Sequence, residues 1–302
     1  DARRGSPAGG RRPFPGLLWE GQDLSDKTVM IWREQGIGDD LRFSTVIPDL
    51  IAEAGHVIVE TEPRLVDLYQ RSWPEATVRA EQDRATGLGN YPEEEIDFDY
   101  TAPAGIAASL RRRTLDALPA QNRPLVACPE KRAAARGWLD SLGNGPKVGL
   151  TWRSGLRNPV RDLFATDLQD WARLQEIEGL KLISLQFGEP QDEIREAAEK
   201  HGLTIHEMPG LDTHRDLDGT AALTAELDFA TGLWNAAAEM TGALCVPGLF
   251  YMPAHHPMQI GTGTLPWHPT LHIYPVMPGF DRPELIGRIL SDARVLLGSG
   301  QS

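Results

Sequence analysis

The feature that most constrains the fold is a repeated alternation of short apolar runs with segments of helical periodicity. The first half of the chain shows apolar runs and intervening helical segments at 28–33, 41–55, 56–60, 63–73 and 76–80. The same alternation restarts near residue 147, with apolar runs at 147–153, 180–188, 204–208, 246–251 and 271–276. Because parallel strands need a crossover connection that is usually a helix, the pattern predicts two parallel α/β sheets.

The predicted domain limits follow from composition. Residues 1–20 are rich in Gly, Pro and Arg and are expected to form a linker. An N-terminal Rossmann-like domain is predicted for 21–143 and a C-terminal one for 147–278, joined at the turn-forming sequence GNGP, with a closing helix in 279–298. The chain begins with Asp1 rather than Met, so we expect it to be part of a longer protein.

Composition excludes some functional classes. The chain has 302 residues and a net charge of −13, and such acidity argues against sequence-independent nucleic-acid binding. No apolar run reaches the roughly 18 residues that a membrane-spanning helix needs, and no secretory signal is visible. Cys128 and Cys245 have neither metal-ligand spacing nor a disulfide framework around them, so a reduced, cytoplasmic protein without a metal is expected.

The loop EQGIGDDLRF (34–43) follows the first predicted strand directly. Ligands of doubly wound sheets bind outside the carboxyl ends of the strands. Gly36 and Gly38 are expected to permit positive φ and close approach of the backbone to a ligand. Asp39 is a candidate to take a proton from a hydroxyl, and Asp40 is expected to serve the helix start. A tight turn with an Asp N-cap remains the alternative.

The second half holds two further clusters, one in the loop after its first predicted strand and one at a predicted helix start. TWRSGLRNPVRD (151–162) places arginines at 153, 157 and 161 among small polar residues, which suits a diphosphate, although a solvated loop whose arginines pair with acids is also compatible. WNAAAEMTGALCVP (234–247) puts small residues at a helix start, which favours either an anion or tight packing on the sheet. The histidines, including His268, lack metal-ligand spacing and are predicted to lie on the surface or in loops.

Together, the segments EQGIGDDLRFSTVIPDLIAEAGHVIVETEPRLVDLY, KVGLTWRSGLRNPVRDL, LKLISLQFGE, DLDGTAALTAELD, TGALCVP and LPWHPTLHIYP resemble the glycosyltransferase domain that follows tetratricopeptide repeats in many bacterial proteins. That domain is similar to the ADP-heptose heptosyltransferases. The resemblance covers most of residues 20–297. It implies a GT-B fold, in which two Rossmann-like domains face each other across a cleft and the last helix crosses back to the first domain.

The resemblance also implies a metal-independent transferase without a cofactor, which passes a sugar from a nucleotide-sugar to a hydroxyl of a protein or glycan. The acceptor would be a Ser or Thr of a protein such as flagellin, held by tetratricopeptide repeats of the parent chain. Asp39 matches the proposed general base, with Gln35, Gly36, Gly38 and Arg42 in the acceptor-side loop. The positions that match sugar-donor contacts are Thr151, Arg153, Ser154, Arg157, Arg161, Gln186, Trp234, Asn235, Ala236 and Glu239.

One departure from the family pattern bears on the sugar donor. Where relatives carry an Asp-Thr pair and a His, this chain carries Trp234, Asn235 and Glu239. The change predicts either a different donor, such as a CMP-linked acidic sugar, or an inactive domain that serves as a binding or scaffold module. A dehydrogenase is disfavoured, because Leu41 occupies the position of the third glycine in the dinucleotide-binding fingerprint.

Overall fold

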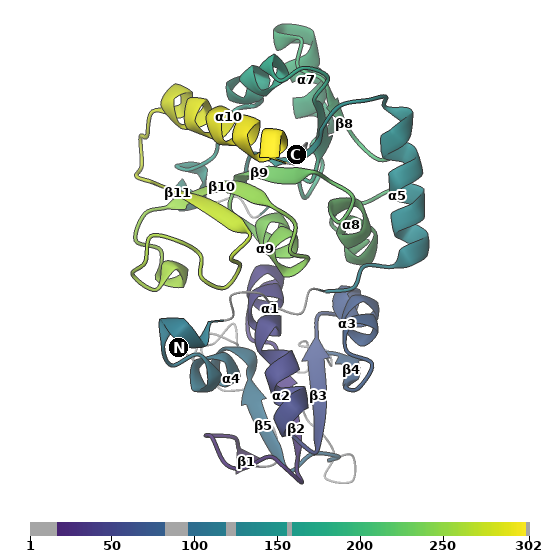
Figure 1. Ribbon diagram of the computed structural model, residues 1–302, viewed down its shortest axis with the longest axis vertical. Helices are drawn as coiled ribbons and strands as arrows, with labels where there is room; N and C mark the ends of the chain where they lie inside the picture. Colours follow the sequence, from purple (N-terminus) through teal and green to yellow (C-terminus); the bar gives the residue numbers. More distant parts are fainter. Residues whose placement is uncertain (1–16, 82–95, 119–124, 156–158, 300–302) are drawn as a thin grey trace. The chain divides into compact units, whose positions relative to one another are not determined.

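The computed structural model describes residues 17–81, 96–118, 125–155 and 159–299 (Figure 1). The chain divides into two compact units, Asp1–Val126 and Ala127–Ser302. Each unit holds one sheet in which all the paired strands run parallel, which confirms the predicted α/β class.

The first unit contains a sheet of order β1-β5-β2-β3-β4. Its strands are β1 (Leu17–Leu18), β2 (Thr28–Trp32), β3 (His56–Thr61), β4 (Thr77–Ala80) and β5 (Tyr100–Pro103). Its helices are α1 (Ile37–Phe43), η1 (Ser44–Val46), α2 (Ile47–Glu53), η2 (Pro63–Leu65), α3 (Val66–Ser72), α4 (Ala104–Arg111) and η5 (Leu115–Ala117). The central strand β2 is buried from its second residue onward, as the continuous apolar run predicts for a strand covered on both faces.

The predicted helix over 41–55 is three consecutive pieces rather than one. The hydroxyls of Ser44 and Thr45 donate to the carbonyls three residues earlier, at 2.7 and 2.8 Å, and Pro48 lies in the first turn of α2. A proline has no N–H and is tolerated there but not in a helix interior. The helix α2 ends at Glu53, and the backbone of its C-cap residue Ala54 is extended.

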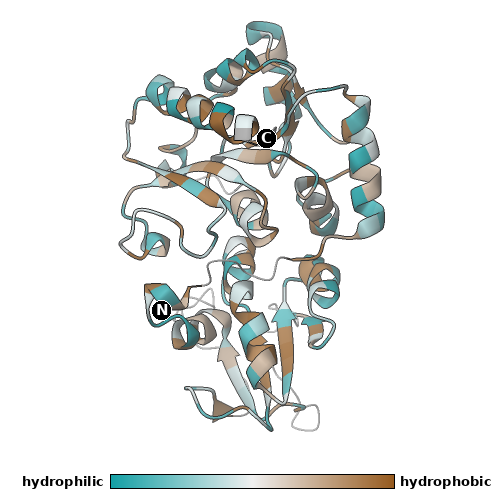
Figure 2. Cartoon of the chain, viewed as in Figure 1, coloured by the Kyte–Doolittle hydropathy of each residue, from teal (hydrophilic) through white to brown (hydrophobic). Residues whose placement is uncertain are grey.

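The second unit contains a sheet of order β11-β10-β9-β6-β7-β8. Its strands are β6 (Lys147–Thr151), β7 (Lys181–Ser184), β8 (Ile205–His206), β9 (Phe229–Leu233), β10 (Gly248–Pro253) and β11 (Leu271–Val276). Its helices are α5 (Pro129–Ser141), α6 (Pro159–Asp162), η6 (Leu168–Glu176), α7 (Gln191–His201), α8 (Leu217–Thr224), α9 (Ala236–Ala243), η7 (Pro257–Gln259) and α10 (Arg282–Ser299). Brown apolar strands lie between helices that carry teal polar residues in Figure 2.

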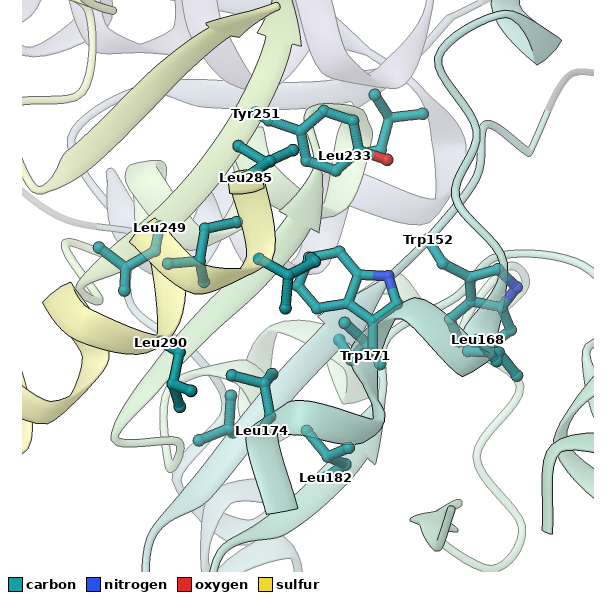
Figure 3. Packing of buried hydrophobic residues seen from close by; sticks show 14 of the residues in the cluster. Trp152, Leu168, Trp171, Leu174, Leu182, Leu233, Leu249, Tyr251, Leu285 and Leu290 are labelled. Atoms are coloured by element: carbon teal, nitrogen blue, oxygen red, sulfur yellow. The ribbon is translucent and has the colours of Figure 1, made fainter. Parts of the chain in front are cut away.

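The core of the second unit forms where α10 and η6 pack on the sheet. Trp171 of η6 stacks on Tyr251 of β10 with ring centroids 6.4 Å apart, and Leu285 and Leu290 of α10 lie in the same cluster (Figure 3). The buried face of the closing helix α10 packs on this cluster, where its apolar side chains meet those of η6 and β10.

Helix α5 belongs to the second unit, although the sequence placed it in the N-terminal domain. It packs beside α8 (Figure 1), where Lys131 Nζ lies 2.8 Å from Asp216 and Arg132 Nε lies 2.6 Å from Glu226. The boundary between the units therefore falls at Val126 rather than at 143–146. Among the described residues, no helix combines the length and the apolar character that a membrane span requires.

Candidate functional site

The sheet of the second unit reverses its strand order between β6 and β9. The chain leaves β6 for β7 and β8 on one side and returns at β9 on the other. Ligands of doubly wound sheets bind outside the carboxyl ends of the strands at such a switch point. Thr151 at the end of β6 pairs with Gly232 near the end of β9. Gly232 has a φ of +133°, and a Cβ atom there would lie 1.7 Å from the Thr151 carbonyl oxygen.

Asn235 joins the two loops that flank the switch point. Its Nδ2 donates to Thr151 Oγ1 at 2.7 Å and to the Arg153 carbonyl at 3.2 Å. Its Oδ1 accepts from the backbone N–H of Ala237 at 2.8 Å, so Asn235 is the N-cap of α9 and Ala236 is the first helical residue. The fold therefore brings these residues of the two predicted clusters together at one end of α9.

Gln186, which follows β7, shapes the loop after β6. Its buried Oε1 accepts from the backbone N–H groups of Trp152 and Arg153, both at 3.1 Å, and its Nε2 donates to the Arg153 carbonyl at 3.1 Å. Since Asn235 donates to that same carbonyl, Gln186 and Asn235 hold the loop from two sides.

The predicted arginine cluster has a different arrangement from the one expected. Arg153 Nε and Nη2 lie 2.8 and 2.5 Å from Glu193 Oε1 in α7, so this guanidinium is neutralised by a carboxylate. Arg161 Nη1 donates to Ser154 Oγ at 3.1 Å on the exposed side of the loop. Arg157 lies outside the described residues.

Trp234, Glu239 and His268 form a hydrogen-bonded chain next to the switch point. Trp234 Nε1 donates to Glu239 Oε1 at 2.8 Å, and Glu239 Oε2 lies 2.8 Å from His268 Nε2. Glu239 and His268 are both fully buried. His268 lies in the loop before β11, as predicted for the histidines, but it is not on the surface. Across the described parts of the chain, no three His, Cys, Asp or Glu side chains group as a metal site.

A groove of about 210 Å³ opens beside the carboxyl ends of β7 and β8. Its lining includes Ser184, Gln186, Glu189, Glu207, Met208 and Asp212. Carboxylates in such a position accept hydrogen bonds from ribose hydroxyls in dinucleotide-binding folds. Gln186 both lines this groove and bonds to the loop after β6, so the groove is continuous with the switch-point residues.

In the first unit, α1 begins immediately after β2, with Gly36 as its N-cap. Gly36 has a φ of −78° and Gly38 lies inside the helix, so the expected positive φ is wrong for both. A Cβ atom at Gly36 would meet nothing within 4 Å in the described chain. Gln35, the exposed residue before it, accepts a 2.5 Å hydrogen bond from Arg33 through its carbonyl oxygen.

Asp39 and Asp40 have different surroundings in the first turn of α1. The Asp39 side chain is 26% exposed, and its Oδ1 accepts from Nη1 of the buried Arg42 at 2.9 Å. Asp40 is buried, accepts from Thr61 Oγ1 at 2.8 Å and lies 3.3 Å from Arg33 Nε. Asp40 thus ties α1 to the end of β3, whereas Asp39 reaches the surface.

Burial raises the pKa of Asp40 to about 6, against the opposing effect of Arg33. A folded-state pKa above the ordinary value of 3.8 means that the native protein binds this proton more tightly than the unfolded chain. Asp40 therefore reduces stability as pH rises through the window from about 4 to above 6. We expect wild type to lose up to about 3 kcal/mol relative to Asp40→Asn across that window.

Urea denaturation of both proteins between pH 4 and pH 8 measures this difference. The same substitution at Asp97, which is exposed and paired with Arg79, serves as the reference. A constant difference between wild type and Asp40→Asn across the range would contradict the raised pKa.

Comparison with known protein sequences gives one curated relative and no family model. No family model matches the chain. It is 33% identical over 272 residues to Protein FlbA of Caulobacter vibrioides, which covers 87% of this chain and 46% of FlbA. The chain thus spans less than half the length of this relative.

Two of the solved structures that it resembles are glycosyltransferases. The glycosyl transferase family 9 structure from Veillonella parvula has a TM-score of 0.65 at 14% identity, over 92% of this chain and 99% of that one. The E. coli ADP-heptose lps heptosyltransferase II has a TM-score of 0.66 at 13% identity, over 91% and 100%. The chain has a GT-B fold. At these identities the likeness concerns the fold alone.

Two side-chain pairs of this GT-B chain were not predicted from the sequence. His268 lies 29 positions from Glu239, and Glu193 lies 40 positions from Arg153. No local sequence pattern predicts contacts over such separations. One signal was available for the first pair. Gly242 follows Glu239 by about one helical turn, and its missing side chain leaves room for a ring against α9.

Proposed function

We propose that this chain is a glycosyltransferase domain, which passes the sugar of a nucleotide-sugar to a hydroxyl group. The observation that carries the proposal is the switch point of the second unit. There, an Asn-capped helix start, α9, and a groove with three carboxylates are linked through the Arg153 carbonyl in a GT-B fold. Helix N-termini and such grooves are the two parts that a nucleoside phosphate requires.

In this proposal the nucleoside end of the sugar donor occupies the groove, where Glu189, Glu207 or Asp212 accepts from its ribose. The phosphate lies at the start of α9, where the positive end of the helix dipole favours an anion. Arg153 is paired with Glu193, so it supports the loop, and Arg161, which donates to Ser154, is a proposed contact of the phosphate. Arg157 stays a predicted contact.

The chemical step assigns Asp39 as general base. The acceptor hydroxyl oxygen attacks the anomeric carbon, the bond from that carbon to the phosphate oxygen breaks, and the nucleotide leaves with the electron pair. Asp39 takes the hydroxyl proton. Gly36 supports this role, because its Cβ position is open and leaves room for an acceptor beside the helix start.

The acceptor that we propose is a Ser or Thr of a protein of the flagellin type, presented by tetratricopeptide repeats elsewhere in a cytoplasmic parent chain. The test incubates the full-length parent protein with purified flagellin and UDP-, GDP-, ADP- and CMP-sugars, followed by intact-mass spectrometry and an assay of released nucleotide. We expect flagellin to gain the mass of a sugar with one donor class. Absence of both sugar transfer and nucleotide release would overturn the proposal, whereas release alone would exclude only this acceptor.

A scaffold without transferase activity is the second candidate. Trp234 and Glu239 stand at positions where the resemblance implies contacts with the sugar donor, yet they bond to each other, and Arg153 is paired with Glu193 within the chain. The two candidates differ in ligand binding, since a scaffold of this kind has no need to bind a nucleotide-sugar.

A further inference from the structure

Resting on the proposed function, we propose that Glu239 and His268 are a positioning pair. They hold the indole of Trp234 beside the start of α9, where the ring stacks on the transferred sugar and selects the sugar donor.

The pair is built to fix one orientation of the indole. Each carboxylate oxygen of Glu239 has its own nitrogen partner, Trp234 Nε1 on one side and His268 Nε2 on the other, both at 2.8 Å. Glu239 and His268 have no exposed surface. A buried carboxylate needs such partners, because the transfer of its charge from water to the protein interior is unfavourable. Rotation of the indole would therefore leave a buried carboxylate oxygen without its partner.

The backbone of α9 is adapted to this arrangement. A Cβ atom at Gly242 would lie 2.3 Å from His268 Cγ, so the imidazole packs directly on the helix. His268 Nδ1 is buried without a hydrogen bond among the described residues. Buried polar atoms of this kind are uncommon in native proteins and are unfavourable for stability. The other ring nitrogen, Nε2, holds Glu239, which gives the buried imidazole a role that offsets this cost.

The position of Trp234 indicates which part of the sugar donor it meets. The groove lies at β7 and β8, and the start of α9 lies at the β6–β9 switch point. Trp234 follows β9, and its ring lies 4.8 Å from that of His256, in the loop after β10. A sugar donor that runs from groove to helix start would place its sugar towards β9 and β10.

The chemistry of the contact follows from the hydrogen bonds. Trp234 Nε1 donates to Glu239, so the indole N–H is already committed within the protein. The half-buried ring then recognises a ligand through its aromatic face, which suits the C–H face of a sugar ring. This mode selects by shape and by the placement of the axial and equatorial groups of the sugar.

The test compares a nucleotide with its own sugar conjugate, by calorimetric titration of the full chain with CMP, ADP, UDP and GDP and with their nucleotide-sugars. For the class that binds, Trp234→Ala is expected to weaken nucleotide-sugar binding by about tenfold, and free-nucleotide binding by less than about twofold. Glu239→Leu is expected to produce the same selective loss. Glu239→Gln keeps an acceptor for the indole and is expected to retain most of the affinity.

A double mutant separates positioning from general damage. Because Glu239 acts through Trp234, Glu239→Leu should add nothing to the loss already present in Trp234→Ala. Tyr274→Phe removes a 2.6 Å hydrogen bond to Asp292 in the same unit and should leave binding unchanged. If Glu239→Leu does not fold, Trp234→Phe and Glu239→Gln provide the comparison. Trp234→Phe keeps an aromatic face but lacks the N–H that Glu239 holds, so it should lose nucleotide-sugar binding selectively, whereas Glu239→Gln should stay within about threefold of wild type.

Two results would overturn the inference. Equal losses for free nucleotide and nucleotide-sugar would show that Trp234 does not contact the sugar, and additive losses in the double mutant would show that Glu239 acts independently. In both cases wild type still binds, so the proposed function survives. If wild type binds neither nucleotides nor nucleotide-sugars, the proposed function fails and the inference fails with it.

Discussion

Asp39→Asn is expected to lower the turnover of sugar transfer by about 10²- to 10⁴-fold, which is the range that general base catalysis contributes. The amide keeps the size of the carboxylate but cannot take the proton of the acceptor hydroxyl. The affinity for the sugar donor should stay within about twofold, because we assign donor binding to the second unit. Initial rates at saturating substrates and a titration of the sugar donor measure the two quantities separately.

Asp97→Asn is the matched control for this substitution. Asp97 also forms an ion pair with an arginine of the first unit, with Arg79 Nη1 3.1 Å from its carboxylate, but it has no place in the proposed site. The turnover of the Asp97→Asn protein should equal that of wild type. A folded Asp39→Asn protein with full activity would remove Asp39 from the role of base, and Asp39→Ala would check that result without the isosteric amide.

Gly232→Ala is expected to destabilise the second unit by about 3–5 kcal/mol, enough to unfold a domain of ordinary stability. The φ of +133° is a region that side chains rarely adopt, and the added Cβ atom would lie 1.7 Å from the Thr151 carbonyl oxygen. The strands β6 and β9 would have to separate at the switch point. Urea denaturation followed by circular dichroism measures the change.

Gly137→Ala provides the control for backbone entropy and helix propensity. Gly137 is exposed in α5, and a Cβ atom there meets nothing within 4 Å of the described chain. Alanine should be neutral or stabilising by up to about 1 kcal/mol. If Gly232→Ala had the stability of wild type, the close contact between the ends of β6 and β9 would be refuted.

The sheets could be predicted from the sequence because their signals are local. Apolar runs such as Thr28–Trp32 are buried on both faces, and the helices between them carry their own periodicity. The helix α4 was not predicted, because its short alanine-rich sequence lies among prolines and has no strong pattern. The predicted domain boundary was misplaced because α5 forms ion pairs with Asp216 and Glu226, which lie far along the chain.

The candidate site could be predicted only in part. The sequence identified the loops after β2 and β6 as strand ends, and the small residues around Ala236 as a helix start. It could not show that Arg153 pairs with Glu193, or that Glu239 is buried between Trp234 and His268, because such contacts depend on tertiary packing. An apparent misfit in the sequence, a carboxylate near an expected phosphate, is thereby explained as an internal partner of two side chains.

The central claim is that the second unit binds a nucleotide-sugar. Calorimetric titration of the folded full chain with UDP-, GDP-, ADP- and CMP-sugars tests it most directly. We predict saturable, one-to-one binding of at least one class, with competition by the corresponding free nucleotide. Absence of binding by every member of the panel would contradict the transferase account and favour the scaffold.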